Sequence, residues 1–148
     1  MTKAIGFIGL GVMGLHSFFQ QKNIPLESVM SKVWNKKIFN NIQQDVDKAS
    51  KVLAEERGAC PDAEDYGIKE RFSNKTAIAP TASISIICGG TSPGIEPIAA
   101  NSYTHKTLSG SFNVKNKYLK DILSKYGKDD DETWSSICLL YTSDAADE

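Results

Sequence analysis

The chain lacks an excess of charge of either sign, long apolar runs and paired cysteines. Its 148 residues carry 17 Lys and Arg against 18 Asp and Glu, a formal net charge of −1. Nothing in this charge balance suggests a broad surface for nucleic acid or for an anionic membrane. No apolar run approaches the ~20 residues of a membrane span, and the glycine-interrupted N-terminus lacks a signal-peptide cleavage site. We therefore expect neither a membrane nor a direct nucleic-acid partner.

Cysteine and histidine are scarce. Cys60, Cys88 and Cys138 are too few and too unevenly spaced for a disulfide framework, which favours a reducing, cytoplasmic location. Cys88 stands between an isoleucine and a glycine, and we interpret it as a small buried hydrophobe. No second ligand stands three or four residues from His16, so no metal site is predicted.

One long amphipathic helix is the clearest periodic signal. Lysines, glutamines and acids fill one of its faces, which we interpret as solvated. The helix is predicted over residues 32–57, can be entered at Glu27 and Ser28, and ends at Gly58. This pattern is typical of an outer helix packed on a sheet or barrel. The apolar face repeats at spacings of three and four and consists of Ile38, Ile42, Val46, Ala49, Val52 and Leu53.

The N-terminal glycines allow two interpretations. Residues 4–8 are predicted as a strand, and Gly9-x-Gly11-x-x-Gly14 has the spacing of a dinucleotide-binding turn. This alone would indicate an NAD(P)-dependent dehydrogenase of the 3-hydroxyisobutyrate type. A Rossmann unit, however, needs a second strand ending in an acid about 20 residues later, and here a long helix follows instead. We favour the interpretation that the glycines allow close packing of a strand-to-helix turn.

Residues 75–97 are the stretch around which the chain is organised. The apolar run Thr76–Ala79 stops at Pro80, which predicts the end of a strand. Small and hydroxylated residues follow, at the place where α/β folds bind ligands and where amide N–H groups of a helix start can hold a phosphate. The alternative is an ordinary strand-to-helix turn capped by Thr and Ser.

The remaining pattern predicts three further features. Residues 59–74 are polar and aperiodic, which predicts a loop. Alternating runs at 101–108 and 111–114 predict a strand–turn–strand. Asn116 is predicted to cap a helix that ends at Gly127, and the acidic run 129–132 suits the start of another helix.

Several of these segments together resemble a known family. AIAPTASIS (77–85) and GTSPGIEP (90–97) resemble the substrate-phosphate loop of the ribonucleotide reductase large, catalytic subunit. GLGVMGLHS (9–17), NSYTHKT (101–107) and NKYL (116–119) follow in that family's order, whereas residues 1–8 match it poorly. The resemblance implies that residues 1–137 are a partial slice of a ten-stranded α/β barrel. It also implies that five residues hold the substrate diphosphate: Pro80, Thr81, Ala82, Ser83 and Ile84.

The resemblance further implies the chemistry of a parent protein. A ribonucleoside-diphosphate reductase reduces ribonucleotides to deoxyribonucleotides for DNA synthesis by thiyl-radical chemistry. It uses a radical from a metal-containing small subunit, a second large subunit and an external dithiol reductant, thioredoxin or glutaredoxin. The chain contains none of the family's radical cysteine, catalytic acid, redox cysteine pair or allosteric sites, so we predict no catalytic residue and no cofactor within it. We expect the isolated chain to be inactive and, with strand edges unpaired, marginally stable. A non-catalytic phosphate-binding module is the remaining alternative.

Residues 138–148 have a different origin in our interpretation. The resemblance stops at Ile137, and CLLYTSDAADE resembles the translation of a transposase-type sequencing adaptor. We therefore expect this tail to be non-native and Cys138 to have no biological role.

Overall fold

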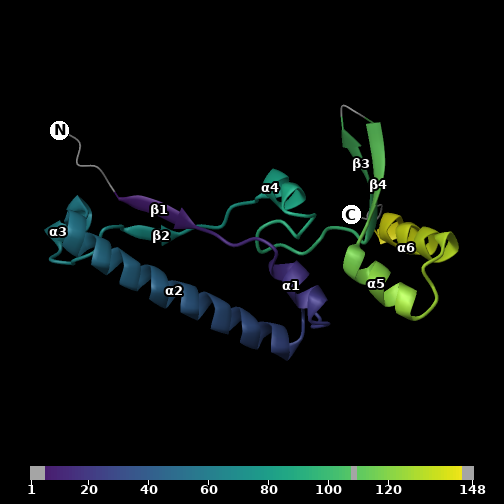
Figure 1. Cartoon of the computed structure of the whole chain (residues 1–148), viewed down its shortest axis with the longest axis horizontal. Helices are drawn as coiled ribbons and strands as arrows, with labels where there is room; N and C mark the ends of the chain where they lie inside the picture. The colour runs from purple at the N-terminus through teal and green to yellow at the C-terminus, as the bar shows by residue number, and fades with distance from the viewer. Residues whose placement is uncertain (1–5, 108–109, 145–148) are drawn as a thin grey trace. The chain divides into compact units, whose positions relative to one another are not determined.

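The computed structural model describes residues 6–107 and 110–144. The chain divides into two compact units, residues 1–96 and residues 97–148, and each is described by itself (Figure 1). Within the described ranges, no helix is long and apolar enough to cross a membrane.

Two short parallel strands lie side by side in the first unit (Figure 1). β1 (Phe7–Leu10) pairs with β2 (Asn74–Thr76). Both predicted strands exist, but their predicted limits were wrong. β1 is shifted toward the C-terminus of the expected range 4–8, of which residues 4 and 5 lie outside the described residues. β2 begins before the expected run 76–79 and ends at its first residue.

Backbone pairing sets the limits of these strands, and apolar content does not. The Ser73 N–H donates to the Gly6 carbonyl at 2.9 Å, so the two segments meet before β2 begins. The Ala77 N–H donates to the Leu10 carbonyl at 3.1 Å, and among the described residues the ladder ends there. The apolar side chains that follow in 78–79 therefore belong to an extended segment without a strand partner among the described residues.

Three helices connect the two strands: α1 (Leu15–Gln21), α2 (Val29–Arg57) and α3 (Pro61–Asp65). α2 confirms the predicted long helix and begins three residues earlier than expected. The Ser28 hydroxyl accepts a hydrogen bond from the Ser31 N–H at 3.1 Å, as a helix cap does. The helix ends before Gly58, as predicted.

Aromatic side chains join α1 to α2. The Phe18 ring meets the Trp34 ring edge-on, with 5.5 Å between centroids. Phe19 is 2% exposed, and burying a phenylalanine side chain contributes roughly 1.5–3 kcal/mol. The Lys37 ammonium lies 5.3 Å from the centre of the Trp34 ring, a cation–π contact on the solvent side.

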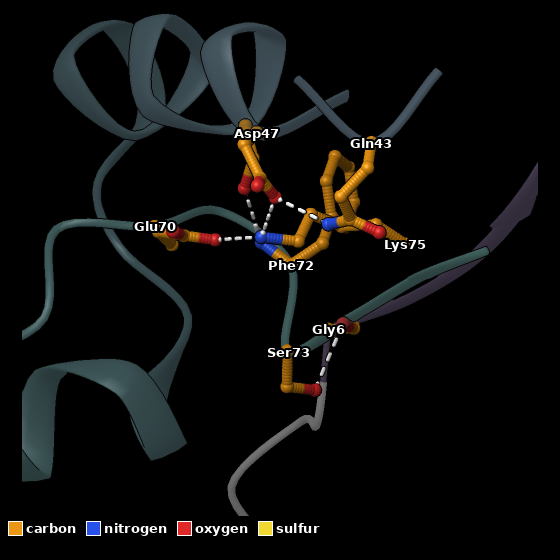
Figure 2. A network of polar contacts seen from close by, with 8 residues as sticks. Gly6, Gln43, Asp47, Glu70, Phe72, Ser73 and Lys75 are labelled. Atoms are coloured by element: carbon orange, nitrogen blue, oxygen red, sulfur yellow. Dashed lines mark hydrogen bonds and ion pairs between the residues drawn. The ribbon is translucent and has the colours of Figure 1, made fainter. Parts of the chain in front are cut away.

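A lysine between two carboxylates joins α2 to β2 (Figure 2). Lys75 Nζ lies 2.5 Å from Asp47 Oδ1 on α2 and also pairs with Glu70. Burial disfavours the charge of Lys75, but its hydrogen bonds to Asp47 and Glu70 outweigh this effect and raise its pKa. The Lys75 hydrogen bond, helped by one from the Gln43 amide at 3.0 Å, lowers the pKa of Asp47. The ion cluster therefore links α2 to β2.

The predicted loop 59–74 contains a helix, so that prediction was wrong. α3 begins with Pro61, where the missing N–H is no loss, and two acids in its first turn suit the positive end of a helix. Cys60 precedes it, is 1% exposed and donates its N–H to the Glu70 carbonyl at 2.9 Å. A helix of five residues is too short to produce a readable apolar period.

The second unit contains the predicted strand–turn–strand. β3 (Ser102–Thr107) pairs antiparallel with β4 (Gly110–Lys115), and residues 108–109 between them lie outside the described residues. α5 (Lys117–Lys125) follows, and the Asn116 side-chain oxygen accepts the Tyr118 N–H at 3.0 Å, which confirms the predicted cap.

α6 (Asp131–Asp144) begins inside the acidic run, as predicted. Asp130 Oδ1 accepts the Thr133 N–H at 2.7 Å and so satisfies an amide of the first turn. Trp134 is 3% exposed, and its indole N–H donates to Asp129 Oδ1 at 2.8 Å. This hydrogen bond is the main reason that the pKa of Asp129 is lowered.

Much apolar surface is left uncovered in both units. Each sheet of the described residues has only two strands and none closes into a barrel. Phe7 is 63% exposed, Ile78 75% and Ile87 83%, whereas most buried apolar residues are small. An exposed set of this kind indicates faces that normally pack on something else.

Candidate functional site

The predicted phosphate loop is an exposed turn between β2 and a short helix. α4 (Ala82–Ile87) begins directly after Thr81, so the five predicted site residues 80–84 lie on one turn of chain. Four of them are exposed and Thr81 is half-buried. Within the described part of the chain, the N–H groups of Ala82, Ser83 and Ile84 have no hydrogen-bond acceptor, as expected for a first helical turn.

Thr81 adopts a backbone conformation that is unusual for its type. Its φ is +48° and its ψ +29°, in the left-handed region that a β-branched residue avoids. Such a conformation costs on the order of 1–3 kcal/mol and persists only where the surroundings impose it. Here the Gly94 N–H donates to Thr81 Oγ1 at 2.7 Å, and the Ser85 N–H donates to the Thr81 carbonyl at 2.9 Å.

Gly94 is the point where the return loop touches the turn. Its φ is +50°, and a Cβ there would lie 2.8 Å from the Ala79 carbonyl oxygen. Only a glycine fits this close approach without displacing backbone. The return loop at Gly94 therefore lies against the extended segment that leads from β2 into the predicted phosphate loop.

The glycines of the dinucleotide-like motif are used for packing. A Cβ at Gly9 would lie 2.8 Å from the Ala77 Cβ, and one at Gly11 would lie 2.8 Å from the Ala77 carbonyl oxygen. Gly14 has φ +80°, and its Cβ would lie 2.6 Å from Thr91 Oγ1. In the described residues, no strand stands between α1 and β2, so the second strand of a Rossmann unit is missing. The favoured packing interpretation explains these glycines; the dehydrogenase interpretation has no support.

Two buried serines tie α1 to the return loop. The Ser17 N–H donates to Ser92 Oγ at 3.1 Å, and the Ser92 N–H donates to Ser17 Oγ at 2.8 Å. Ser17 is 4% exposed and Ser92 0% exposed. The Gly14 N–H donates to the Ser92 carbonyl at 2.9 Å. Sequence reasoning missed this pair, because a serine in GTSPG gives no sign of which distant hydroxyl it meets.

Groups with catalytic chemistry do not converge on the turn. Burial is the main cause of the lowered pKa of His16, and the Glu27 carboxylate partly opposes it. Cys88 is exposed, so the prediction that it is buried was wrong; α4 buries Ser85 and turns its isoleucines outward. No group of three or more His, Cys, Asp or Glu residues in the described ranges is placed to hold a metal ion. Among the described residues, the turn presents exposed backbone amides and no nucleophile paired with a base.

These features define an α/β fragment with an exposed strand-to-helix turn. A family profile for the ribonucleotide reductase barrel domain matches residues 3–74 and 61–146. The ribonucleoside-diphosphate reductase large subunit of Invertebrate iridescent virus 6 is 48% identical over 132 residues, which cover 88% of this chain and 14% of that protein. A vitamin B12-dependent ribonucleoside-diphosphate reductase of Thermoplasma acidophilum is 41% identical over 115 residues, 74% of this chain and 15% of that protein.

A solved structure agrees with these sequence relatives. The class Id ribonucleotide reductase alpha subunit of Actinobacillus ureae superposes with a TM-score of 0.75 at 36% identity, covering 89% of this chain and 23% of that one. The chain belongs to the ribonucleotide reductase barrel-domain family. It spans less than a quarter of the length of each of these relatives.

Proposed function

We propose that this chain is part of the large subunit of a ribonucleoside-diphosphate reductase and that its loop 80–84 binds the substrate diphosphate. The observation that carries the proposal is the exposed first turn of α4, held by Thr81 in a strained conformation, in a chain of this family. Free amides at a helix start favour an anion. Pro80, Thr81, Ala82, Ser83 and Ile84 are the proposed contacts.

The reduction itself is proposed for the parent protein only. There, thiyl-radical chemistry would convert ribonucleotides to deoxyribonucleotides, inside a barrel of ten strands. Two of the named relatives with this chain's fold or sequence are described as a large or an alpha subunit, which supports a separate small, metal-containing radical generator as partner. A second large subunit and thioredoxin or glutaredoxin as dithiol reductant complete the proposed set. We assign this chain no catalytic residue.

The apolar surface supports the proposal that the rest of a barrel is needed. A groove of about 700 Å³ separates α2 from the segment of β1 and β2. Phe39 and Ile42 line it from the helix, Leu10 lines it from β1, and Ile78 lines it from the extended segment that follows β2. Neighbouring barrel segments would cover such faces. We therefore propose that the isolated chain is inactive, and turnover of any ribonucleoside diphosphate by the purified 148-residue chain would contradict this.

Binding is tested by titrating the isotope-labelled chain with inorganic pyrophosphate and following its amide resonances. We expect the resonances of 81–84 to shift and those of the second unit to stay. Ser83→Asp places a negative charge in the first turn, where it favours the helix but repels the ligand. At 4 Å that repulsion amounts to about 1 kcal/mol in water and about 4 kcal/mol near a protein surface, so affinity falls by a factor between roughly five and roughly a thousand.

The matched control is Ser111→Asp, which adds the same charge at an exposed serine of β4. Equal losses of affinity in both variants would indicate a non-specific charge effect and would contradict the loop assignment. Shifts on adding NADPH, abolished by Gly11→Asp, would restore the dehydrogenase interpretation. A sharp cooperative unfolding transition with pyrophosphate binding and no turnover would favour a free-standing phosphate-binding module.

The cytoplasmic location belongs to the same proposal, and the free thiols of Cys60 and Cys88 support it. The adaptor origin of residues 138–148 stays a prediction, and with it the limit of the reductase segment at Ile137. Long-read sequencing of the source DNA across that codon tests both: continuation into further reductase sequence is the expected result, and an unchanged reading to Glu148 would contradict it.

A further inference from the structure

Two segments that are far apart in sequence meet each other, and one of them also contacts the proposed phosphate loop, which makes three segments in contact. They are α1, the return loop 91–94 and the turn that begins at Thr81. Ser17 of α1 exchanges two hydrogen bonds with Ser92, and Gly94, two residues further, donates to Thr81 Oγ1. A continuous path of hydrogen bonds and short backbone therefore leads from α1 to the first residue of the turn.

Ser17 and Ser92 lie in buried positions, where a hydroxyl group is destabilising unless it has a hydrogen-bond partner. Ser17 lies inside α1, where alanine would favour the helix more. Both side chains are almost completely buried, and buried hydroxyls need partners. Each hydroxyl accepts the other residue's N–H, so the pair fixes both the side chains and the two backbones.

The turn at the other end of this path needs support. Thr81 holds a left-handed conformation, and the hydrogen bond that it accepts from Gly94 ties its side chain in place. The Thr91 N–H also donates to the Ser85 carbonyl at 3.1 Å, so the return loop touches α4 at a second point. Displacing residues 91–94 would release both contacts.

We propose that Ser17 and Ser92 form a positioning clasp that sets the conformation of the phosphate loop through the Gly94–Thr81 hydrogen bond. The two serines contact no substrate in this proposal and act only through the return loop. It deepens the proposed function and rests on it for the identity of the ligand. The conformational part stands independently of ligand binding.

The first test is amide hydrogen exchange in the 148-residue chain with Ser17→Ala and Ser92→Ala. Alanine suits a helix at least as well as serine, so Ser17→Ala is expected to fold. We expect exchange at the Gly94 and Thr91 amides, the donors of these two contacts, to rise about tenfold in both variants. The matched control is Ser50→Ala, because Ser50 is 1% exposed and its hydroxyl likewise accepts a backbone N–H, that of Phe72 at 3.2 Å.

In the Ser50→Ala control, the Gly94 amide should exchange at the same rate as in the unsubstituted 148-residue chain, whereas the Phe72 amide should exchange faster. A uniform rise at all protected amides in Ser17→Ala or Ser92→Ala would show general destabilisation and would overturn the clasp. Unchanged exchange at Gly94 in both variants would overturn it as well.

The second test is pyrophosphate affinity of the same proteins. We expect about tenfold weaker binding by the two clasp variants and unchanged binding by Ser50→Ala. If the parent sequence binds pyrophosphate and the clasp variants bind equally well, the clasp is refuted while the proposed function stands. If the parent sequence does not bind, but exchange at Gly94 still rises selectively, the proposed function fails for this chain and the clasp stands.

Discussion

Replacing Gly14 by alanine should destabilise the first unit more than replacing any glycine with the same backbone conformation but open surroundings. Gly14 has φ +80°, and an added Cβ would lie 2.6 Å from Thr91 Oγ1. Gly67 has φ +69° with nothing within 4 Å of an added Cβ. Both alanines pay about 1–2 kcal/mol for the left-handed conformation, partly offset by a stiffer unfolded chain.

Only Gly14→Ala is also destabilised by overpacking, by about 1–3 kcal/mol. We therefore expect the free energy of unfolding of Gly14→Ala to lie about 1–3 kcal/mol below that of Gly67→Ala. Urea unfolding followed by circular dichroism measures this difference, and with a urea dependence of about 1–3 kcal/mol per molar it corresponds to a midpoint shift of roughly 1 M.

A second substitution isolates the clash. Thr91→Ala removes the Oγ1 atom, and the next nearest atom to the added Cβ, the Thr91 Cβ, lies at 3.8 Å. In the Gly14→Ala background this change should therefore recover most of the overpacking term, as a favourable coupling energy in a double-mutant cycle. Equal midpoints for Gly14→Ala and Gly67→Ala, or no recovery in the double variant, would refute the packing explanation of this glycine.

Three further predictions concern other parts of the chain. The pKa of Asp47 is lowered in the folded chain, so its contribution to stability is present above its unfolded pKa of about 3.9 and is lost as the pH falls through its folded pKa. The urea midpoint of the chain should therefore drop in acid, and Asp47→Asn should make this drop smaller. In a Cys138→Ser background, iodoacetamide should alkylate Cys88 in the folded chain and Cys60 only after unfolding. Comparable alkylation rates of the two thiols in the folded chain, measured by mass spectrometry, would contradict the burial of Cys60. Asn116→Ala should lower the stability of the second unit by about 1 kcal/mol, and an unchanged thermal midpoint would show that this cap contributes nothing.

Local chemistry decided what could be predicted from the sequence. The end of α2 and the start of α5 were foreseen, because Gly58 and Asn116 act on backbone groups within a few residues, whereas the start of α2 at Ser28 was placed three residues too late. The hairpin was foreseen for the same reason. The resemblance of five separate segments to one family was also sufficient to place the chain, and the family profile confirms it.

What could not be predicted depends on distant partners. The limits of β1 and β2 follow from where the two backbones meet, at Gly6 with Ser73 and at Leu10 with Ala77. Cys88 was misjudged because burial of α4 depends on which of its faces has a neighbour. In the candidate site, residues 80–84 were named in advance, whereas the support from the return loop appeared only in the structure.

The pairing of β1 with β2 has a consequence for how the chain acquires its structure. The two strands are separated by residues 11–73, whereas β3 and β4 are separated by two residues. A hairpin forms in about 1–10 μs, but contacts between distant segments form more slowly because a long loop must first close. During synthesis β1 leaves the ribosome long before β2 exists, with Phe7, Ile8 and Leu10 on an unpaired edge. For that interval these residues are an aggregation hazard, and chaperone capture of nascent chains is expected to centre on them.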